Sequence, residues 1–175
     1  MATKSESAIL RSQGFAPIAD ARARILILGT LPGKPSLEAG QYYAQKQNVF
    51  WKILCMLTNS PLDLSYAKKK KLLIENGIAL WDVCHSAERA GSLDSNIKLA
   101  TMITNDFESF LAKHKEIKRI CFNGQFAEKI FRSKVMPEIA AKWGRFQFEV
   151  LPSTSPAYAA MRFEEKLAQW KIILQ

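Results

Sequence analysis

Short apolar runs alternate with segments of helical periodicity along this chain. Four runs have the character of strands, at residues 24–29, 78–83, 118–122 and 146–151. The first is a continuous, β-branched apolar run, which is typical of a strand covered on both faces. The last alternates strictly between apolar and polar residues, which predicts a half-exposed strand near the edge of a sheet.

Between these runs, apolar residues recur at intervals of three and four, the spacing that predicts amphipathic helices. The spacing occurs in the segments 50–57, 107–114, 126–131 and 163–174. Strands that alternate with helices favour right-handed crossovers, a mainly parallel sheet and helices on both of its faces. We therefore predict an α/β fold in one domain that spans residues 1–175.

The carboxyl ends of parallel strands share one edge of a sheet, and ligands of such folds bind along that edge. Four loops begin there in this sequence: Gly29–Gly33, the residues from Asp82 onward, Asn123–Gly124 and Leu151–Pro156. The glycines of the first loop allow main-chain N–H groups to point toward a phosphate or an oxygen-rich ligand, and a turn that simply needs glycine explains them equally well. The hydroxyl groups of the last loop, which also holds two prolines, suit phosphate oxygens.

A polar stretch with adjacent tyrosines precedes the helix predicted at 50–57. It contains Tyr42, Tyr43, Lys46 and Asn48. A tyrosine ring can stack on a nucleic-acid base, and a lysine can pair with a phosphate. Asn48 stands where the helix begins, so its plain structural role is an N-cap, although one asparagine can both cap a helix and face a crevice.

The composition adds a basic charge balance to this picture. Hydrophobic residues make up 48% of the chain and charged residues 23%, which excludes intrinsic disorder as the main state. Lys and Arg outnumber Asp and Glu by 25 to 16, and the formal charge of +9 favours a polyanionic partner such as nucleic acid or an acidic membrane surface. The run Lys68–Lys71 is interpreted as the solvated face of a helix rather than a binding patch.

The cysteines and histidines predict neither a disulfide framework nor a metal site. The three cysteines are odd in number and widely spaced, which fits a reducing compartment. Cys84–His85 is the one neighbouring pair of metal-ligand type, and a buried thiol beside a satisfied histidine explains it better, so we expect no metal. No segment has the apolar character of a signal peptide or a membrane span, so we expect a cytoplasmic protein with no membrane partner.

Five motifs, in order along nearly the whole chain, resemble the uracil-DNA glycosylase superfamily, and most closely its branch of hypoxanthine-DNA glycosylases. They are Leu28–Gly33; Gln41–Ala44 with Asn48–Trp51; Gly77–Val83 with Gly91–Ser95; Cys121–Gly124; and Leu151–Pro156. The resemblance begins near Phe15, so we expect residues 1–14 to be a loosely ordered N-terminal segment. It implies a three-layer α/β/α sandwich around a central four-stranded, mainly parallel sheet, and a base-excision enzyme that needs no cofactor.

The resemblance also implies a role for individual residues. Many members carry Asn or Asp as the third residue of the first loop, where it handles the attacking water, and this chain has Leu31 there. The hypoxanthine branch likewise lacks a polar residue at that position and relies on the asparagine before Phe-Trp, so the expected catalytic residue is Asn48. Tyr43 matches the aromatic residue that stacks on the flipped base, and Asp82 matches the side chain that reads the base edge. The expected base-binding set is completed by Thr30, Leu31 and Asn123.

The expected reaction is hydrolysis of the N-glycosidic bond without strand cleavage, because no lysine stands in a motif as a Schiff-base nucleophile. A carboxylate at Asp82 accepts the N1–H of hypoxanthine, which adenine lacks, while main-chain N–H groups of the first loop donate to O6. Asn48 positions the water, and the competing assignment makes Asp82 the carboxylate that activates it. The expected substrate is double-stranded DNA that contains deaminated bases. Single-stranded DNA remains an alternative substrate.

The remaining expectations concern the grip on DNA and the alternatives. The residues expected to contact the DNA backbone are Gly33, Lys46, Ser92, Ser153, Thr154, Ser155 and Pro156. The loop Pro156–Tyr158 is the candidate for the wedge that fills the vacated base stack, and the protein is expected to be a monomer. Uracil or mismatched thymine is the alternative substrate. A DNA-binding protein without catalysis is the alternative function, because Leu31 replaces the polar residue of most members.

Overall fold

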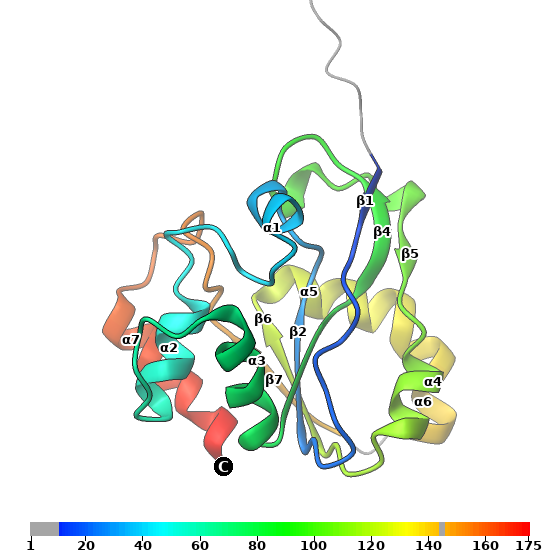
Figure 1. The fold of residues 1–175 in the computed structure, drawn as a ribbon. Helices are drawn as coiled ribbons and strands as arrows, with labels where there is room; N and C mark the ends of the chain where they lie inside the picture. Colours follow the sequence, from blue (N-terminus) through cyan, green and yellow to red (C-terminus); the bar gives the residue numbers. More distant parts are fainter. Residues whose placement is uncertain (1–10, 144–145) are drawn as a thin grey trace, which may run out of the picture.

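The computed structural model describes residues 11–143 and 146–175, and a four-stranded parallel sheet forms its centre. The strands are β3 (Ile78–Asp82), β2 (Ile25–Gly29), β6 (Arg119–Asn123) and β7 (Gln147–Leu151), in that order across the sheet. Each neighbouring pair is parallel. The strands predicted from the apolar runs are confirmed, and the alternating run forms the edge strand β7, as expected (Figure 1).

Helices cover both faces of this sheet, so it is the middle of three layers (Figure 1). One face carries α2 (Phe50–Leu57), α3 (Tyr66–Glu75) and α7 (Phe163–Trp170). The other carries α4 (Phe107–Lys113), α5 (Gln125–Ile130) and α6 (Met136–Trp143), and the π-helical turn Phe131–Val135 joins α5 to α6. The predicted α/β/α sandwich is confirmed.

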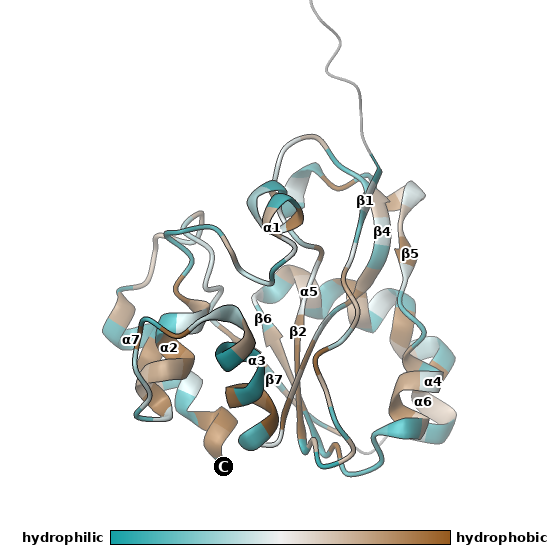
Figure 2. Cartoon of the chain, viewed as in Figure 1, coloured by the Kyte–Doolittle hydropathy of each residue, from teal (hydrophilic) through white to brown (hydrophobic). Residues whose placement is uncertain are grey.

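The strands feed two separate cores because successive residues point to opposite faces of the sheet. In β2, Leu28 packs into the core that contains Phe131, whereas Ile27 packs into the core of Phe50 and Trp170. Full burial of a side chain of this size contributes about 1.5–3 kcal/mol. Figure 2 shows the strands of the central sheet as predominantly hydrophobic, which explains why the apolar runs located them so well.

A second, smaller sheet lies beside the first and was not predicted. It is antiparallel, with the order β1 (Arg11–Gln13), β4 (Cys84–Glu88) and β5 (Ile103–Thr104). Residues 11–13 thus form a strand, which corrects the expectation of a loose segment over 1–14; residues 1–10 lie outside the described residues. The strand β4 follows β3 after Val83 alone, and its mixed sequence has no apolar run that would have revealed it.

Short helices complete the chain. The helix α1 (Lys34–Ala39) follows β2 through the first loop, and 3₁₀ turns occupy Asp94–Asn96, Leu99–Thr101 and Lys171–Leu174. The lysine run lies on α3, where Lys71 pairs with Glu75 at 3.4 Å, as a solvated helix face would. Within residues 11–143 and 146–175, no helix has the length and apolar character needed to cross a membrane.

Candidate active site

Three groups from different parts of the chain converge over the end of β2. Gly29 pairs in register with Asp82, the last residue of the neighbouring strand β3. A Cβ atom at Gly29 would lie 2.5 Å from Asp82 Oδ1 and 2.8 Å from the Tyr43 hydroxyl oxygen. Only glycine leaves room for both groups, so a cluster of polar groups, named the pocket from here on, lies at the carboxyl edge of the sheet.

Tyr43 is held in the pocket by a strained backbone and by stacking. Its φ is +53°, in the left-handed region that non-glycine residues rarely adopt, and its ring stacks on Phe50 with centroids 4.2 Å apart. The neighbouring Tyr42 is buried and its hydroxyl donates to the carbonyl of Ala16, which agrees with a purely structural role. Strain of this kind persists only where the surroundings impose it, and it is concentrated at functional sites.

The Tyr43 hydroxyl is buried without a hydrogen-bond partner among the described residues. Burial raises its pKa far above the ordinary value, the nearby Asp82 adds to the rise, and the Asn123 side chain opposes it. The tyrosine is therefore a neutral O–H that points into the pocket beside Asp82 and Asn123. A buried hydroxyl without a partner costs free energy, so it is suited to a ligand that supplies one.

Asn123, at the end of β6, is locked in place by Thr154. Its amide nitrogen donates to the Thr154 hydroxyl at 2.8 Å, and its amide oxygen accepts the Thr154 N–H at 2.9 Å. Thr154 is 1% exposed, so its side chain is too buried to make the contact with a DNA backbone that the sequence predicts. Its role in this structure is to orient Asn123.

Asn48 is connected to the same network through the residue that follows it. The N–H of Val49 donates to the Thr154 carbonyl at 3.1 Å, which joins the start of α2 to the loop after β7. The N-cap of α2 is Val49 and not Asn48, so the expected N-cap role of Asn48 is wrong. The Asn48 side-chain oxygen instead accepts the Phe50 N–H at 3.0 Å in the turn before the helix, and the side chain is half-buried. A carbonyl oxygen has a second lone pair, so the same atom can still accept a proton from a water molecule.

The Asp82 carboxyl is the most perturbed acid of the pocket. The residue is 3% exposed, and its Oδ2 has no hydrogen-bond partner among the described residues. Burial raises the pKa of Asp82 to about 8; the neighbouring carboxylate of Asp94 raises it further, and the guanidinium of Arg89 opposes the rise. At neutral pH this carboxyl is therefore largely protonated.

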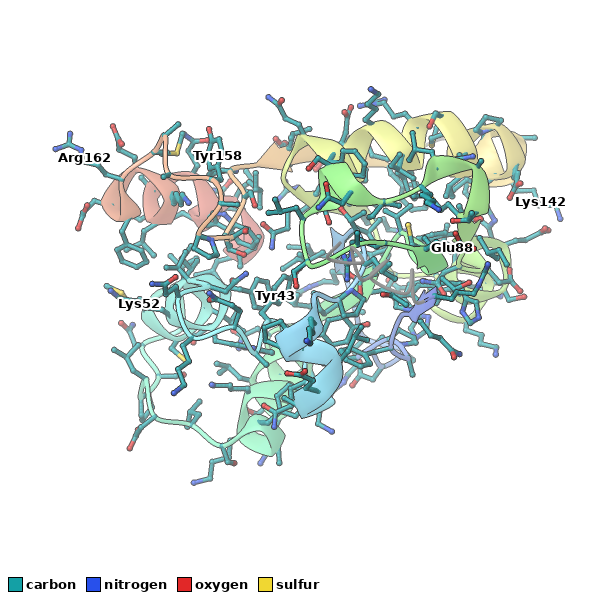
Figure 3. The ribbon with its side chains drawn as sticks, turned by 90° about the horizontal axis from the view of Figure 1, so that it is seen from above. Tyr43, Lys52, Glu88, Lys142, Tyr158 and Arg162 are labelled. Carbon is teal, nitrogen blue, oxygen red and sulfur yellow. The ribbon has the colours of Figure 1, made fainter. Side chains whose placement is uncertain are left out.

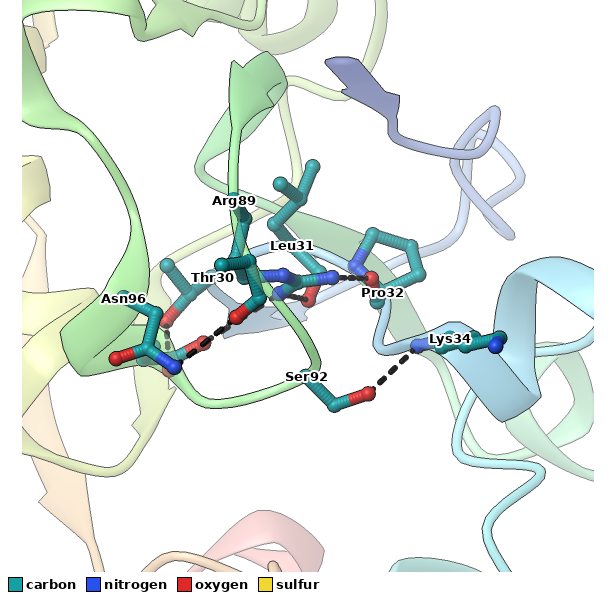
Figure 4. Close-up of polar contacts among 9 residues, drawn as sticks. Thr30, Leu31, Pro32, Lys34, Arg89, Ser92 and Asn96 are labelled. Atoms are coloured by element: carbon teal, nitrogen blue, oxygen red, sulfur yellow. Dashed lines mark hydrogen bonds and ion pairs between the residues drawn. The ribbon is translucent and has the colours of Figure 1, made fainter. Parts of the chain in front are cut away.

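A buried arginine that the sequence analysis missed holds the first loop (Figure 4). The side chain of Arg89 is fully buried, and its guanidinium donates to the carbonyl of Leu31 at 3.2 Å and to the carbonyl of Pro32. Asp94 lies 3.9 Å from the same guanidinium and accepts the Thr30 hydroxyl at 2.8 Å. Both residues stand in or beside the Gly91–Ser95 motif, but no local pattern indicates that they reach back to the first loop.

This arrangement changes what the first loop can contribute. The Leu31 side chain is buried against Cys84, Ala87 and Ile97, so it faces a core and not the pocket. Thr30 is buried as well, with its hydroxyl bonded to Asp94. The main-chain N–H groups of Thr30 and Leu31, however, donate to no acceptor within residues 11–143 and 146–175. Main-chain contact is what these two residues can offer a ligand.

The residues expected at the DNA backbone lie in loops and make mainly local contacts. Ser92 accepts the Lys34 N–H at 3.0 Å and packs against Gly33, so it supports the start of α1. Ser153 accepts the Ser155 N–H, and Ser155 accepts the N–H of Ala157, which makes this loop rigid. Lys46 and Pro156 are exposed. Seen from above, Tyr43 lies near the centre of the molecule, with Lys52, Arg162 and Lys142 toward its periphery (Figure 3).

The described residues do not gather metal ligands. Within 11–143 and 146–175, no three His, Cys, Asp or Glu side chains lie together as a metal ion would require. Cys55, Cys84 and Cys121 are all buried and free. The polar groups of the pocket are the carboxyl group of Asp82, the phenol of Tyr43 and the carboxamide of Asn123.

Comparison with known proteins gives a consistent result. A family model described as the Uracil DNA glycosylase superfamily matches residues 16–174. A hypoxanthine DNA glycosylase of Methanosarcina acetivorans is 33% identical over 165 residues, which cover 93% of this chain and 98% of that protein. A hypoxanthine DNA glycosylase of Methanosarcina barkeri is 35% identical over 117 residues, 66% of this chain and 73% of the relative. A solution NMR structure from M. acetivorans, provisionally assigned as a uracil DNA glycosylase, superposes with a TM-score of 0.77 at 31% identity, covering 94% of this chain and 98% of that one.

Proposed function

This chain belongs to the Uracil DNA glycosylase superfamily, and we propose that it removes hypoxanthine from DNA by hydrolysing the N-glycosidic bond of a flipped nucleotide. It is a DNA glycosylase, and the two relatives described above are named hypoxanthine DNA glycosylases. The observation that carries the base-binding role is the pocket over Gly29, where Asp82 and Tyr43 present unpartnered polar atoms, and the relatives' names favour hypoxanthine among the bases that fit it. The alternative substrates of the same pocket are uracil and mismatched thymine.

The enzyme must first extrude the nucleotide, because a base inside a duplex cannot reach a buried pocket. Flipping costs a few kcal/mol, and stacking on an aromatic side chain returns about 1–3 kcal/mol per base. Tyr43 is proposed as that stacking residue. One side of its ring is already supported by Phe50, and this support would hold the ring rigid against an incoming base.

The base edge is read by side chains that the two neighbouring strands bring to one point. Asp82 faces the N–H of the base, and the free N–H groups of Thr30 and Leu31 supply donors for the carbonyl oxygen. Asn123, fixed by Thr154, completes the wall of the pocket. A site with this many unpartnered polar atoms discriminates strongly, because an analogue that cannot pair with them leaves them buried and unsatisfied.

Bond cleavage produces an oxocarbenium-like sugar and a base that leaves with negative charge. The proposed catalytic residue, Asn48, holds the attacking water through its amide oxygen, which keeps a free lone pair beside the Phe50 N–H. Its contribution is positioning rather than basicity, and such positioning accounts for several kcal/mol of a barrier. The water adds to the sugar carbon and releases a proton, the base departs with the electrons of the broken bond and takes up a proton, and the phosphate backbone stays intact, so the enzyme is monofunctional.

The loop residues are proposed to grip the DNA backbone. They are Gly33, Lys46, Ser92, Ser153, Ser155 and Pro156. Thr154 is reassigned to the positioning of Asn123 because it is buried. The proposed wedge is the loop Pro156–Tyr158. Tyr158 is 38% exposed, and the Lys166 ammonium group holds the loop by donating to the Tyr158 carbonyl at 2.8 Å. The charge of +9 supplies the sequence-independent affinity for DNA.

We also propose that the protein acts in the cytoplasm as a single-domain monomer on double-stranded DNA. The three free, buried cysteines support a reducing compartment. The continuous central sheet, with both cores formed from segments along the whole described chain, supports one domain.

The test is an assay on defined duplexes that each contain one hypoxanthine, uracil or G·T site. Alkali cleaves the strand wherever a base has been removed. Cleavage at hypoxanthine above uracil and thymine supports the proposal, and cleavage at uracil alone overturns the substrate. Tight binding in a gel shift without any cleavage supports a DNA-binding protein that lacks catalysis.

A pair of matched variants tests the catalytic residue. Asn48→Ala should lower the single-turnover rate at least a hundredfold, while it removes one hydrogen bond to the Phe50 N–H worth about 0.5–1.5 kcal/mol of stability. Ser65→Ala removes the capping hydrogen bond of α3 at a residue outside the proposed site, and it should leave the rate unchanged. If the two variants have the same rate, Asn48 is not catalytic.

A further inference from the structure

The Asp82 carboxyl lies in surroundings that do not accommodate a negative charge. It is 3% exposed, Oδ2 has no hydrogen-bond partner, and none of the ion pairs between described residues includes it. An isolated ionised carboxylate without donors is expensive to bury, so such a group takes up a proton instead. The geometry, independent of any titration, therefore favours the neutral acid.

The departing base supplies a second argument. When the glycosidic bond breaks, negative charge develops on the base and is shared by its carbonyl oxygen. A carboxylate beside that oxygen would repel the charge, whereas an O–H aimed at it would form a hydrogen bond that strengthens in the transition state. An ionised Asp82 would thus oppose the reaction that the pocket performs.

We propose that Asp82 meets the flipped base as a neutral carboxylic acid, which accepts the lactam N–H through one oxygen and donates its own proton to the lactam carbonyl through the other. This inference rests on the proposed function, and it replaces the ionised Asp82 that was expected from the sequence. The cyclic pair of hydrogen bonds fits N1–H and O6 of hypoxanthine, and it fits N3–H and O4 of uracil equally well. Bases with a lactam edge are therefore the substrate class of this acid.

The same acid can pair with adenine if its donor and acceptor roles are exchanged. Rejection of adenine must then come from another part of the pocket. The N–H groups of Thr30 and Leu31, which are free for a carbonyl oxygen, would face the amino group of adenine donor to donor. Selection against adenine is thus assigned to the first loop, and acceleration of base departure to Asp82.

The proton on Asp82 is governed by the charged and titratable groups packed around it. Asp94 favours protonation and Arg89 opposes it; the other titratable neighbours are Tyr42, Tyr43 and Cys84. Burial is the largest cause and raises the pKa of Asp82 to about 8. The acid form is therefore present below about pH 8 and is lost as the pH rises through that value.

Asp82→Asn provides the decisive variant, because an amide has the donor and acceptor of a neutral acid but cannot ionise. We expect its single-turnover rate on hypoxanthine at pH 7 to be within tenfold of the wild-type rate. The ratio of wild-type to variant rate should be flat from pH 5.5 to 7.5 and then fall about tenfold per pH unit. Ionisation of the substrate itself affects both proteins and cancels in this ratio.

Asp94→Asn is the second variant. Removal of its charge should shift the midpoint of the wild-type pH profile downward, because Asp94 favours the protonated form. A hundredfold loss of rate in a folded Asp82→Asn protein, or a ratio that rises with pH, overturns the proposal in favour of a carboxylate.

A direct measurement keeps the inference separate from the proposed function. The ¹³Cγ chemical shift of Asp82, measured by NMR on the wild-type protein from pH 5 to 9, reports its protonation whether or not any base is removed. A midpoint above pH 7 supports the neutral acid, and a midpoint below pH 6 overturns it. Absence of cleavage on every duplex with a midpoint above pH 7 would refute the enzymatic function and leave the neutral acid standing.

Discussion

Replacement of Arg89 by methionine should destabilise the protein more than any surface charge substitution. The side chain is fully buried, and it donates to the carbonyls of Leu31 and Pro32, both of which are buried residues. Methionine has a similar length and volume, so the variant Arg89→Met tests the lost hydrogen bonds rather than a new cavity.

The expected loss of stability follows from the contacts. Each hydrogen bond from a charged group to a carbonyl contributes about 1.5–3 kcal/mol, so the two together contribute about 3–6 kcal/mol. Asp94 is 40% exposed and can regain water, so its ion pair with Arg89 adds less than about 1 kcal/mol. The buried Nε without a partner is removed at the same time, which offsets part of the loss. We expect a net decrease of about 3 kcal/mol in the free energy of unfolding.

The assay is urea unfolding followed by far-UV circular dichroism, with the free energy extrapolated to water. The control is Arg22→Met, which removes an exposed arginine paired with Asp20 at 2.7 Å. An exposed pair is screened by water and salt and contributes little to stability, so this variant should unfold almost like the wild type.

Equal stability of the two arginine variants would refute the reasoning. It would mean that water hydrogen-bonds to the carbonyls of Leu31 and Pro32 when the guanidinium is absent, and that the conformation of the first loop does not require Arg89. A folded Arg89→Met protein with an unchanged glycosylase rate would similarly refute the view that Arg89 positions the N–H groups of Thr30 and Leu31.

Further outcomes follow from the pocket. Gly29→Ala should lower the affinity for the base at least a hundredfold, because its Cβ would lie within 2.8 Å of both the Asp82 carboxyl and the Tyr43 hydroxyl. A circular dichroism spectrum checks that the variant folds. Thr154→Val keeps the shape but removes the hydroxyl bonded to Asn123; it should lower the rate about tenfold, as measured in single turnover against Thr58→Val at the C-terminal end of α2. The free energy of unfolding should fall as the pH rises from about 4 to 8, because the raised pKa of Asp82 makes the folded state bind the extra proton in that window, and Asp82→Asn should flatten this slope. DNA affinity should fall steeply with salt, and a slope near zero would contradict backbone binding through the basic charge.

The four strands of the central sheet were predictable because helices cover the sheet, so each strand needs apolar residues in its own sequence. A strand such as β2, which is covered on both faces, needs an uninterrupted apolar run, and β7 at the edge needs only alternation. The strand β4 was not predicted because its sequence has no apolar pattern, and its pairing with β1 and β5 stabilises it instead. Local pattern therefore predicts a strand where its apolar residues form a continuous or a regularly alternating run.

The pocket divides in the same way. Glycine at position 29, the tyrosine pair and the asparagine before α2 stand in motifs that resemble a family, so they were predictable as candidates. Thr154 was misjudged, because a hydroxyl in a loop suits a phosphate and an internal partner equally well until the partner is seen. Arg89 was missed, because nothing near it in the sequence says which carbonyls it will bind.

The sequence by itself determined the layered α/β fold, the edge of the sheet at which a ligand binds and the acidic residue at the end of β3. Only the tertiary structure decided the state of that acid. The register that sets Gly29 opposite Asp82, and the contacts that bring Tyr43 over both, remove the carboxyl from water and from any donor. Protonation depends on this desolvation, which is a property of three distant segments packed together and of none of them alone.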